Sequence, residues 1–250
     1  RVHRNHKVDI FPTFLGAHCI PDEYNGNSKA YVDLLCNEMI PAVAEQGIAK
    51  FCDVFCEIGY FDIADSQKIL ERAIEYDLVP RIHADEFSDT GGAKLASEIK
   101  AISADHLMEI SDEGIESLAN SKTIAILLPG TTFFLGNKNY APARKLIDKG
   151  VHIAIATDFN PGSCHIKSMP FIIALSCIYL GLSAEEALKA ATWSGACAIN
   201  EEERIGSIEI GKKADLIIWD IDTIEQIPYN IPNSHIRNVI KKGVPLISLD

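Results

Sequence analysis

Two histidines stand at the ends of apolar runs and close to carboxylates. His83 is followed three residues later by Glu86, and His106 ends an apolar run that begins at Ile102. Imidazole nitrogen is a common zinc ligand, and a nearby carboxylate can handle the proton of a water on the metal. A lone strand-end histidine is more often a hydrogen-bonded structural residue, so neither segment is decisive by itself. Together they predict a metal-dependent hydrolytic site.

An aspartate follows a third apolar run. The segment 156–163 puts Asp158 at the end of the run 151–157 and continues as a turn rich in hydrogen-bonding groups. Asp158 taken alone could equally be a turn-forming or capping residue. Imidazole nitrogens and a carboxylate from several strand ends can converge on one ion and leave a position open for water. We therefore predict that His83, His106 and Asp158 share one site.

The apolar runs alternate with helical patterns. Six runs rich in Val, Ile and Phe are candidate strands, at 8–15, 51–56, 78–82, 102–106, 124–128 and 151–157. Helix-like stretches lie between them at 29–45, 63–76, 113–120 and 142–149. This alternation predicts an α/β fold with a parallel sheet. No glycine-rich phosphate loop follows any strand, so a TIM-like (β/α)8 barrel is preferred to an open nucleotide-binding sheet.

A barrel also explains where the polar residues lie. Barrel enzymes carry their working groups at the carboxyl ends of the strands, and these candidates all follow strands: His18, His83 with Glu86, His106, and Asp158 with Asn160. Six strands cannot close a barrel of eight, and the sequence begins with Arg1. We expect the first two strands to precede this sequence in the natural protein.

The predicted secondary structure changes in the last third of the chain. The run 169–182 is too short to span a bilayer and predicts a buried helix, and Ser183 with Glu186 forms a capping box ahead of a helix at 187–199. From Arg204 onward short strands and turns predict a small β appendage. The expected domains are a partial barrel at 1–203 and strands of a small β-sandwich at 204–250.

The net charge and the cysteine content limit the kinds of partner and compartment that are expected. Lys and Arg number 23 against 35 Asp and Glu, a formal net charge of -12, so nucleic acid and anionic membranes are not expected partners. Seven scattered cysteines form no disulfide framework, which favours a reducing cytoplasm. The expected partner is a small-molecule substrate. The oligomeric state is not fixed by the sequence, and a homodimer is compatible with it.

These residues resemble the amidohydrolase superfamily, in which histidines end the fifth and sixth strands and an aspartate ends the eighth. His83, His106 and Asp158 match those positions in order, and 206–215 resembles the segment that leads into the superfamily's β-sandwich. Within the superfamily, three segments look like the imidazolonepropionase family: 13–24, 53–57, and 83–86 completed by 158–163. That resemblance covers essentially the whole chain.

The resemblance implies a reaction and a role for each residue. The reaction is hydrolysis of the ring C–N bond of 4-imidazolone-5-propionate to N-formimino-L-glutamate, in histidine degradation, with one divalent zinc or iron ion. His83 and Asp158 would hold the metal, Glu86 would orient or deprotonate water, and His106 would hydrogen-bond the substrate carbonyl. Asp158 could also shuttle the proton. Substrate-binding roles are implied for His18, Asn160, Gly162 and Ser163.

One departure from the superfamily pattern qualifies this assignment. The first-strand His-x-His is missing, since His3 and His6 have the wrong spacing and precede the first predicted strand. We expect the full protein to supply that motif and the family's substrate-binding arginine and tyrosines, and these 250 residues alone to be a poor catalyst. Two alternatives stay open: another amidohydrolase, such as a cyclic-amide hydrolase or aminoazole deaminase, and a non-catalytic barrel that has lost its first-strand ligands.

Overall fold

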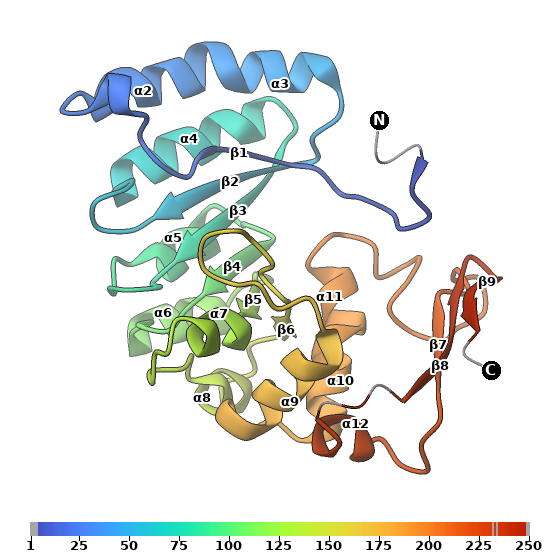
Figure 1. Ribbon diagram of the computed structural model, residues 1–250. Coiled ribbons are helices and arrows are strands. Elements are labelled where there is room, and N and C mark those ends of the chain that lie inside the picture. Colours follow the sequence, from blue (N-terminus) through green and yellow to red (C-terminus); the bar gives the residue numbers. More distant parts are fainter. Residues whose placement is uncertain (1–4, 232, 234, 249–250) are drawn as a thin grey trace. The chain divides into compact units, whose positions relative to one another are not determined.

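The computed structural model describes residues 5–231, 233 and 235–248, so His3 lies outside the described residues. The chain packs into two compact units (Figure 1). Unit 2 comprises Phe11–Ile126 and Lys145–His152. Unit 1 comprises Arg1–Ile10, Leu127–Arg144 and Ile153–Asp250.

Unit 2 is built on parallel strands that follow one another in chain order, as predicted. These are β1 (Thr13–Ala17), β2 (Phe51–Cys56), β3 (Val79–Ala84), β4 (Ser103–His106) and β5 (Ile124–Leu127), the last of which reaches the unit boundary. Helix α4 (Ile63–Glu75) packs on β2 and β3, and α5 (Gly92–Glu98) packs on β3 and β4. Helix α6 (Asp112–Ala119) packs on α5. Every residue of β2 is buried, as expected for a strand covered on both faces.

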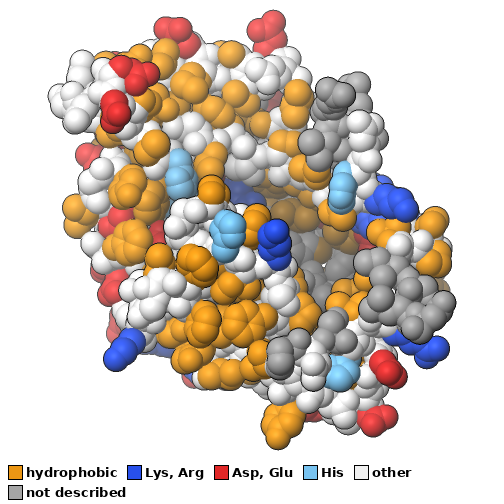
Figure 2. Space-filling model, viewed as in Figure 1, with side chains coloured by type: hydrophobic (Ala, Val, Ile, Leu, Met, Phe, Trp, Pro, Cys, Tyr) orange, Lys and Arg blue, Asp and Glu red, His pale blue; other side chains and the backbone are white. Residues whose placement is uncertain are grey.

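The first predicted strand was placed too early. The run 8–15 was expected to be a strand, but β1 begins at Thr13 and Val8 is 53% exposed. Pro12 has no N–H to donate to a ladder, and its carbonyl accepts the N–H of Lys50, so pairing with β2 starts just after it. In Figure 2 hydrophobic side chains reach the surface in the upper part of the view, where β1 and its neighbouring helices lie.

The predicted helix at 29–45 is interrupted. It consists of α2 (Ser28–Leu34), a π-helical turn η2 (Leu35–Met39) and α3 (Ile40–Gln46), preceded by a short 3-10 turn η1 (Asp22–Tyr24). Pro41 lies in the first turn of α3 and cannot donate to the preceding turn, which accounts for the irregular turn there. Gly47 ends the helix at φ 62°, the left-handed conformation that glycine adopts without strain.

Unit 1 contains β6 (Ile153–Ile155) and the helices α7 (Pro129–Phe134), α9 (Met169–Tyr179), α10 (Ala184–Ala191) and α11 (Trp193–Cys197); α8 (Ala143–Asp148) straddles the two units. Helix α9 buries Ile172 through Ser176, which confirms the predicted buried helix. The capping box of Ser183 and Glu186 is present, but the predicted helix 187–199 breaks at Thr192, whose φ and ψ are -120° and -86°. None of the described helices is long and apolar enough to cross a membrane.

The carboxyl-terminal segment of unit 1 forms an antiparallel sheet in the order β7 (Leu216–Trp219), β8 (Ile236–Lys241) and β9 (Val244–Ser248), with α12 (Gln226–Tyr229) between β7 and β8. The predicted β appendage is therefore present as one three-stranded sheet among the described residues. Gly206 opens this segment at φ 94°, where a Cβ atom would lie 2.7 Å from the Cβ of Ala196, so only glycine fits.

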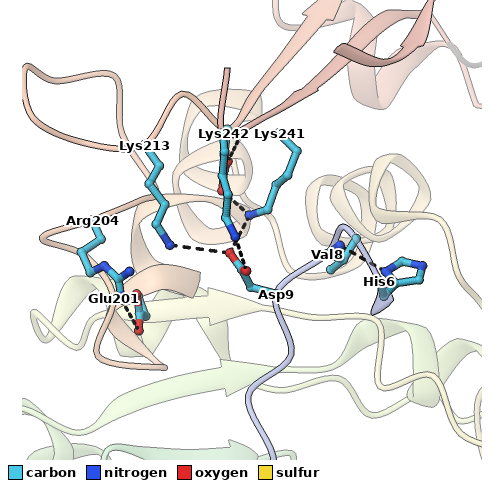
Figure 3. Close-up of polar contacts among 9 residues, drawn as sticks. His6, Val8, Asp9, Glu201, Arg204, Lys213, Lys241 and Lys242 are labelled. Atoms are coloured by element: carbon cyan, nitrogen blue, oxygen red, sulfur yellow. Dashed lines mark hydrogen bonds and ion pairs between the residues drawn. The ribbon is translucent and has the colours of Figure 1, made fainter. Parts of the chain in front are cut away.

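An ionic contact joins the amino-terminal segment to this sheet within unit 1 (Figure 3). The carboxylate of Asp9 lies 2.7 Å from Nζ of Lys242, 3.0 Å from Nζ of Lys241 and 3.6 Å from Nζ of Lys213. Hydrogen bonds from Lys242 and Lys241 lower the pKa of Asp9 well below its usual range. In the same segment, Nδ1 of His6 accepts the backbone N–H of Val8 at 3.1 Å.

Phe51 opens β2 and is fully buried, at 1% exposure. Replacing Phe51 by alanine is expected to destabilise the protein by about 3–5 kcal/mol, because it removes a large core side chain and leaves a cavity. Denaturant unfolding measures the loss. Phe134→Ala is the matched control, since Phe134 is 50% exposed and its loss should cost no more than about 0.5 kcal/mol. Equal effects of the two substitutions would contradict the assignment of Phe51 to the core.

Candidate active site

A buried polar group lies on one face of the central strands of unit 2. In the parallel register Asp53 pairs with Arg81, and His83 pairs with Asp105, so these side chains share a face of the sheet. Oδ1 of Asp53 lies 2.9 Å from Nδ1 of His83. Nη2 of Arg81 donates to Oδ2 of Asp105 at 3.3 Å. The face therefore carries a carboxylate–imidazole pair beside a carboxylate–guanidinium pair.

Three histidine rings lie in a row at the carboxyl ends of β1, β3 and β4. The ring centroids of His18 and His83 are 5.0 Å apart, and those of His83 and His106 are 5.2 Å apart. Phe55 stacks on His18 with a centroid distance of 5.2 Å. The structure thus brings together the three histidines that the sequence singled out, although His18 and His106 are far apart in the chain.

Glu86 lies beside the last of these rings. Oε1 of Glu86 is 3.5 Å from Nδ1 of His106, and both side chains are buried, at 7% and 3% exposure. Burial, with the nearby His83 and His18, lowers the pKa of His106 well below its usual value. His106 is therefore a neutral imidazole near pH 7, able to donate one hydrogen bond.

Two carboxylates fix the loop that carries Glu86. Oδ1 of Asp85 accepts the backbone N–H groups of Thr90 and Gly92, each at 3.1 Å, and Oδ2 accepts that of Ala93 at 3.1 Å. These bonds hold the amino end of α5 to the end of β3. Gly92 is required there, because a Cβ atom at that position would lie 2.8 Å from the Cβ of Ala84.

Glu57, which follows β2, completes the support of this loop. Its Oε2 accepts the backbone N–H groups of Phe87 at 2.9 Å and Ser88 at 3.2 Å, and its Oε1 accepts that of Ile58 at 2.8 Å. Glu57 is 3% exposed. The residues directly after Glu86 are thus held by a carboxylate from the neighbouring strand, which limits how far Glu86 can move.

The backbone is strained where the strands end. Asp85, His106 and Leu107 have positive φ angles of 50°, 80° and 62°. Leucine is rarely found in this region, and such residues cost about 1–3 kcal/mol each unless the surroundings hold them. Leu107 is fully buried and its N–H bonds the carbonyl of Ala84 at 3.1 Å, so packing and the adjacent strand maintain the conformation. Strain of this kind is typical of functional sites.

The remaining predicted site residues belong to unit 1. Asp158 follows β6 with a φ of 49°, and its Oδ2 accepts the hydroxyl of Thr131 at 2.5 Å. The amide of Asn160 is engaged in its own turn: Oδ1 accepts the N–H groups of Gly162 at 2.8 Å and Ser163 at 2.7 Å. Its Nδ2 donates to the carbonyl of Asp158 at 2.8 Å. Asn160 therefore holds the loop in shape and fixes the backbone positions of Gly162 and Ser163.

Unit 2 carries donor atoms of the types that a divalent metal takes. Asp53, His83 and Asp105 each bring one such atom within 4.8 Å of the others, although Asp53 also contacts Nδ1 of His83 and Arg81 donates to Asp105. Oδ1 of Asp105 is buried and has no hydrogen-bond partner among the described residues. Imidazole nitrogen and carboxylate oxygen suit zinc and iron. The pKa values of the two carboxyl groups shift in opposite directions. Burial raises the pKa of Asp105 despite Arg81, whereas at Asp53 the effect of burial is outweighed by His83, Arg81 and His18 together, so that its pKa is lowered.

Four further residues of this buried group were not predicted as site residues from the sequence: Asp53, Arg81, Asp85 and Asp105. Asp53 and Asp105 interrupt apolar strands that are otherwise buried, and a charged residue inside such a strand is the signal that could have found them. Asp85 stands between two predicted site residues and could have been recognised as a helix-start carboxylate.

Residues 65–246 match the Amidohydrolase family. The chain is 50% identical over 241 residues to the imidazolonepropionase of Symbiobacterium thermophilum, covering 96% of this chain and 57% of that protein. It is 46% identical over 243 residues to the imidazolonepropionase of Alkaliphilus metalliredigens, covering 97% of this chain and 58% of that protein. The chain thus spans somewhat over half the length of these relatives.

Among solved structures, an adenosine deaminase from Xanthomonas campestris with bound zinc superimposes with a TM-score of 0.73 at 21% identity, covering 100% of this chain and 64% of that one. A Xaa-Pro dipeptidase with bound methionine in its active site gives 0.72 at 20% identity, covering 98% and 70%. At these identities the likeness concerns the fold.

Proposed function

Because this chain belongs to the amidohydrolase family, we propose that it forms the catalytic part of an imidazolone propionate hydrolase. Water adds to the ring carbonyl carbon of 4-imidazolone-5-propionate, the ring C–N bond breaks, and the released nitrogen takes up a proton, giving N-formimino-L-glutamate. The observation that carries the proposal is the identity of 50% to an imidazolonepropionase over 96% of the chain. The cluster of His18, His83, His106 and Glu86 supplies the chemical groups that such a reaction needs.

One divalent metal ion, zinc or iron, would be held by His83 and Asp158. When bound, such an ion polarises a carbonyl and lowers the pKa of a coordinated water. Nδ1 of His83 is engaged by Asp53, so Nε2 is the nitrogen that would serve as ligand. The zinc in the adenosine deaminase of the same fold is consistent with this choice of metal.

The proton steps fall to Glu86 and His106. Glu86 accepts a proton from the attacking water and returns it to the departing ring nitrogen, a role that suits a buried carboxylate held by a fixed loop. His106, neutral because it is buried, donates a hydrogen bond to the substrate carbonyl and to the negative charge that grows on its oxygen. Asp158 is a second candidate for carrying the proton.

Substrate contacts are assigned to His18, Asn160, Gly162 and Ser163. The stacking of His18 on Phe55 holds its ring beside His83, where a planar five-membered ring could be recognised by hydrogen bonding. Asn160 would act partly by holding this turn, because its Oδ1 accepts the N–H groups of Gly162 and Ser163, and the turn would lie against the propionate tail. The seven free thiols fit a reducing cytoplasm as the compartment, with a small-molecule substrate as the partner.

Two other functions remain testable beside this one. Other amidohydrolases, such as cyclic-amide hydrolases or aminoazole deaminases, use similar ligand sets, and a non-catalytic barrel could keep the fold alone. Incubating the metal-loaded full-length protein with imidazolone propionate, and in parallel with other cyclic amides and aminoazoles, distinguishes them. We expect N-formimino-L-glutamate by mass spectrometry with about one metal per chain. A protein that binds metal and leaves imidazolone propionate unchanged would overturn the proposal. Turnover of one of the other substrates would then identify the activity.

A further inference from the structure

The contact between Asp53 and His83 carries an inference that rests on the proposed function. We propose that Asp53 is a positioning residue that fixes the tautomer and the orientation of the His83 ring, so that Nε2 is the nitrogen offered to a metal. Asp53 is 3% exposed and its Oδ1 lies 2.9 Å from Nδ1 of His83. A carboxylate can only accept a hydrogen bond, so Nδ1 carries the proton, and in the neutral ring Nε2 then carries the lone pair.

The strand register explains why Asp53 approaches the His83 ring from the amino end of the strands. His83 is paired with Phe55, and Asp53 lies two residues earlier in β2 on the same face. The carboxylate therefore reaches the ring from the amino end of the strands and meets Nδ1, the nitrogen closer to the backbone. Nε2 then faces away from Asp53. Neighbouring rings limit rotation, since His18 and His106 lie 5.0 and 5.2 Å from the His83 centroid.

Arg81 makes this arrangement possible by engaging the second buried carboxylate. It donates to Asp105 at 3.3 Å, and both side chains are largely buried, at 15% and 8% exposure. Without this cation, two carboxylates that share one face with His83 would repel each other and compete for its ring. A metal held directly by Asp53, His83 and Asp105 would have to displace the Nδ1 proton and stand beside the Arg81 guanidinium. The charges present favour hydrogen-bond support over such an ion.

A carboxylate that accepts the second ring N–H of a metal-binding histidine strengthens metal binding. Its loss lowers metal affinity or activity by about 10- to 100-fold, because the ring loses both its fixed tautomer and part of its basicity. Asp53→Ala should therefore weaken zinc binding by about 10- to 100-fold. Asp53→Asn keeps an acceptor oxygen on Nδ1–H and should recover part of that loss.

The test needs no substrate, so its failure is distinct from a failure of the proposed reaction. Two-bond ¹⁵N–¹H spectra of metal-free protein labelled in its histidines report the tautomer of each ring, and His83→Gln identifies the His83 signals. We expect the Nδ1–H form of His83 in the unchanged protein and in Asp53→Asn, and a shift toward the Nε2–H form in Asp53→Ala. Zinc affinity is measured by competition with a chromophoric chelator.

Asp105→Asn separates the proposal from direct metal binding by the three residues. If Asp53 acts through His83, Asp105→Asn should change zinc affinity much less than Asp53→Ala does. Equal losses in the two variants would overturn the proposal in favour of a metal held by both carboxylates. An Nε2–H tautomer in the unchanged protein would also overturn it, and that result depends on no variant of Asp53 or Asp105.

Discussion

Replacing Glu86 by glutamine is expected to lower kcat for imidazolone propionate hydrolysis by about 10²- to 10⁴-fold, the usual contribution of a positioned general acid–base. Glutamine has nearly the same shape and can still hydrogen-bond, but it cannot take a proton from water. Glu86 is 7% exposed and lies 3.5 Å from His106 across the site. Its loop is held through backbone bonds from Phe87 and Ser88 to Glu57, which the substitution leaves intact. Steady-state kinetics with matched metal content measures the effect.

The control for Glu86→Gln is Glu116→Gln, on the outer surface of α6. The Glu116 side chain is 69% exposed and lies 3.8 Å from Lys149, so its substitution should leave kcat within about twofold. Metal content should be unchanged in both variants. If Glu86→Gln retained kcat within tenfold of the unchanged protein, Glu86 would not be the proton carrier and Asp158 would become the leading candidate.

Much of the fold followed from local patterns. The strand at 51–56 was predicted with its observed limits, because a short run that is apolar except for Asp53 and is bounded by Lys50 and Glu57 fits a strand buried on both faces. The capping box of Ser183 and Glu186 was likewise readable from side-chain chemistry. The errors have physical causes: Pro12 delays β1, and Pro41 disturbs the helix that contains it.

The candidate site was only half visible in the sequence. Strand-end histidines could be found because each ends an apolar run, whereas Asp53 and Arg81 acquire meaning only through register with a neighbouring strand. The register between neighbouring strands decides which residues lie side by side on one face of the sheet. The local sequence pattern of a single strand does not determine that register. The sequence predicts a substrate contact for Asn160 but does not indicate its local role, in which its amide oxygen accepts the Gly162 and Ser163 N–H groups of its own turn.

Replacing His83 by alanine is expected to have the largest effect of all, a fall in kcat/KM of about 10³-fold or more together with loss of bound metal. A divalent ion supplies several kcal/mol of transition-state stabilisation and makes water reactive near neutral pH, and each 1.36 kcal/mol corresponds to a factor of ten in rate. Metal content by mass spectrometry and hydrolysis of imidazolone propionate are measured on the same sample. Chelation of the unchanged protein should reproduce the defect, and adding back zinc or iron(II) separately should show which ion restores turnover.

His6→Ala is the matched control, because His6 is an exposed histidine whose Nδ1 accepts the N–H of Val8 within its own segment. It should bind metal and turn over substrate like the unchanged protein. Retention of a full metal complement in His83→Ala would remove this residue from the ligand set and with it the reason for the buried Asp53 contact. Loss of metal with retained hydrolysis would instead mean that the reaction proceeds without the ion, and the general acid–base pair of Glu86 and His106 would then have to provide the acceleration unaided.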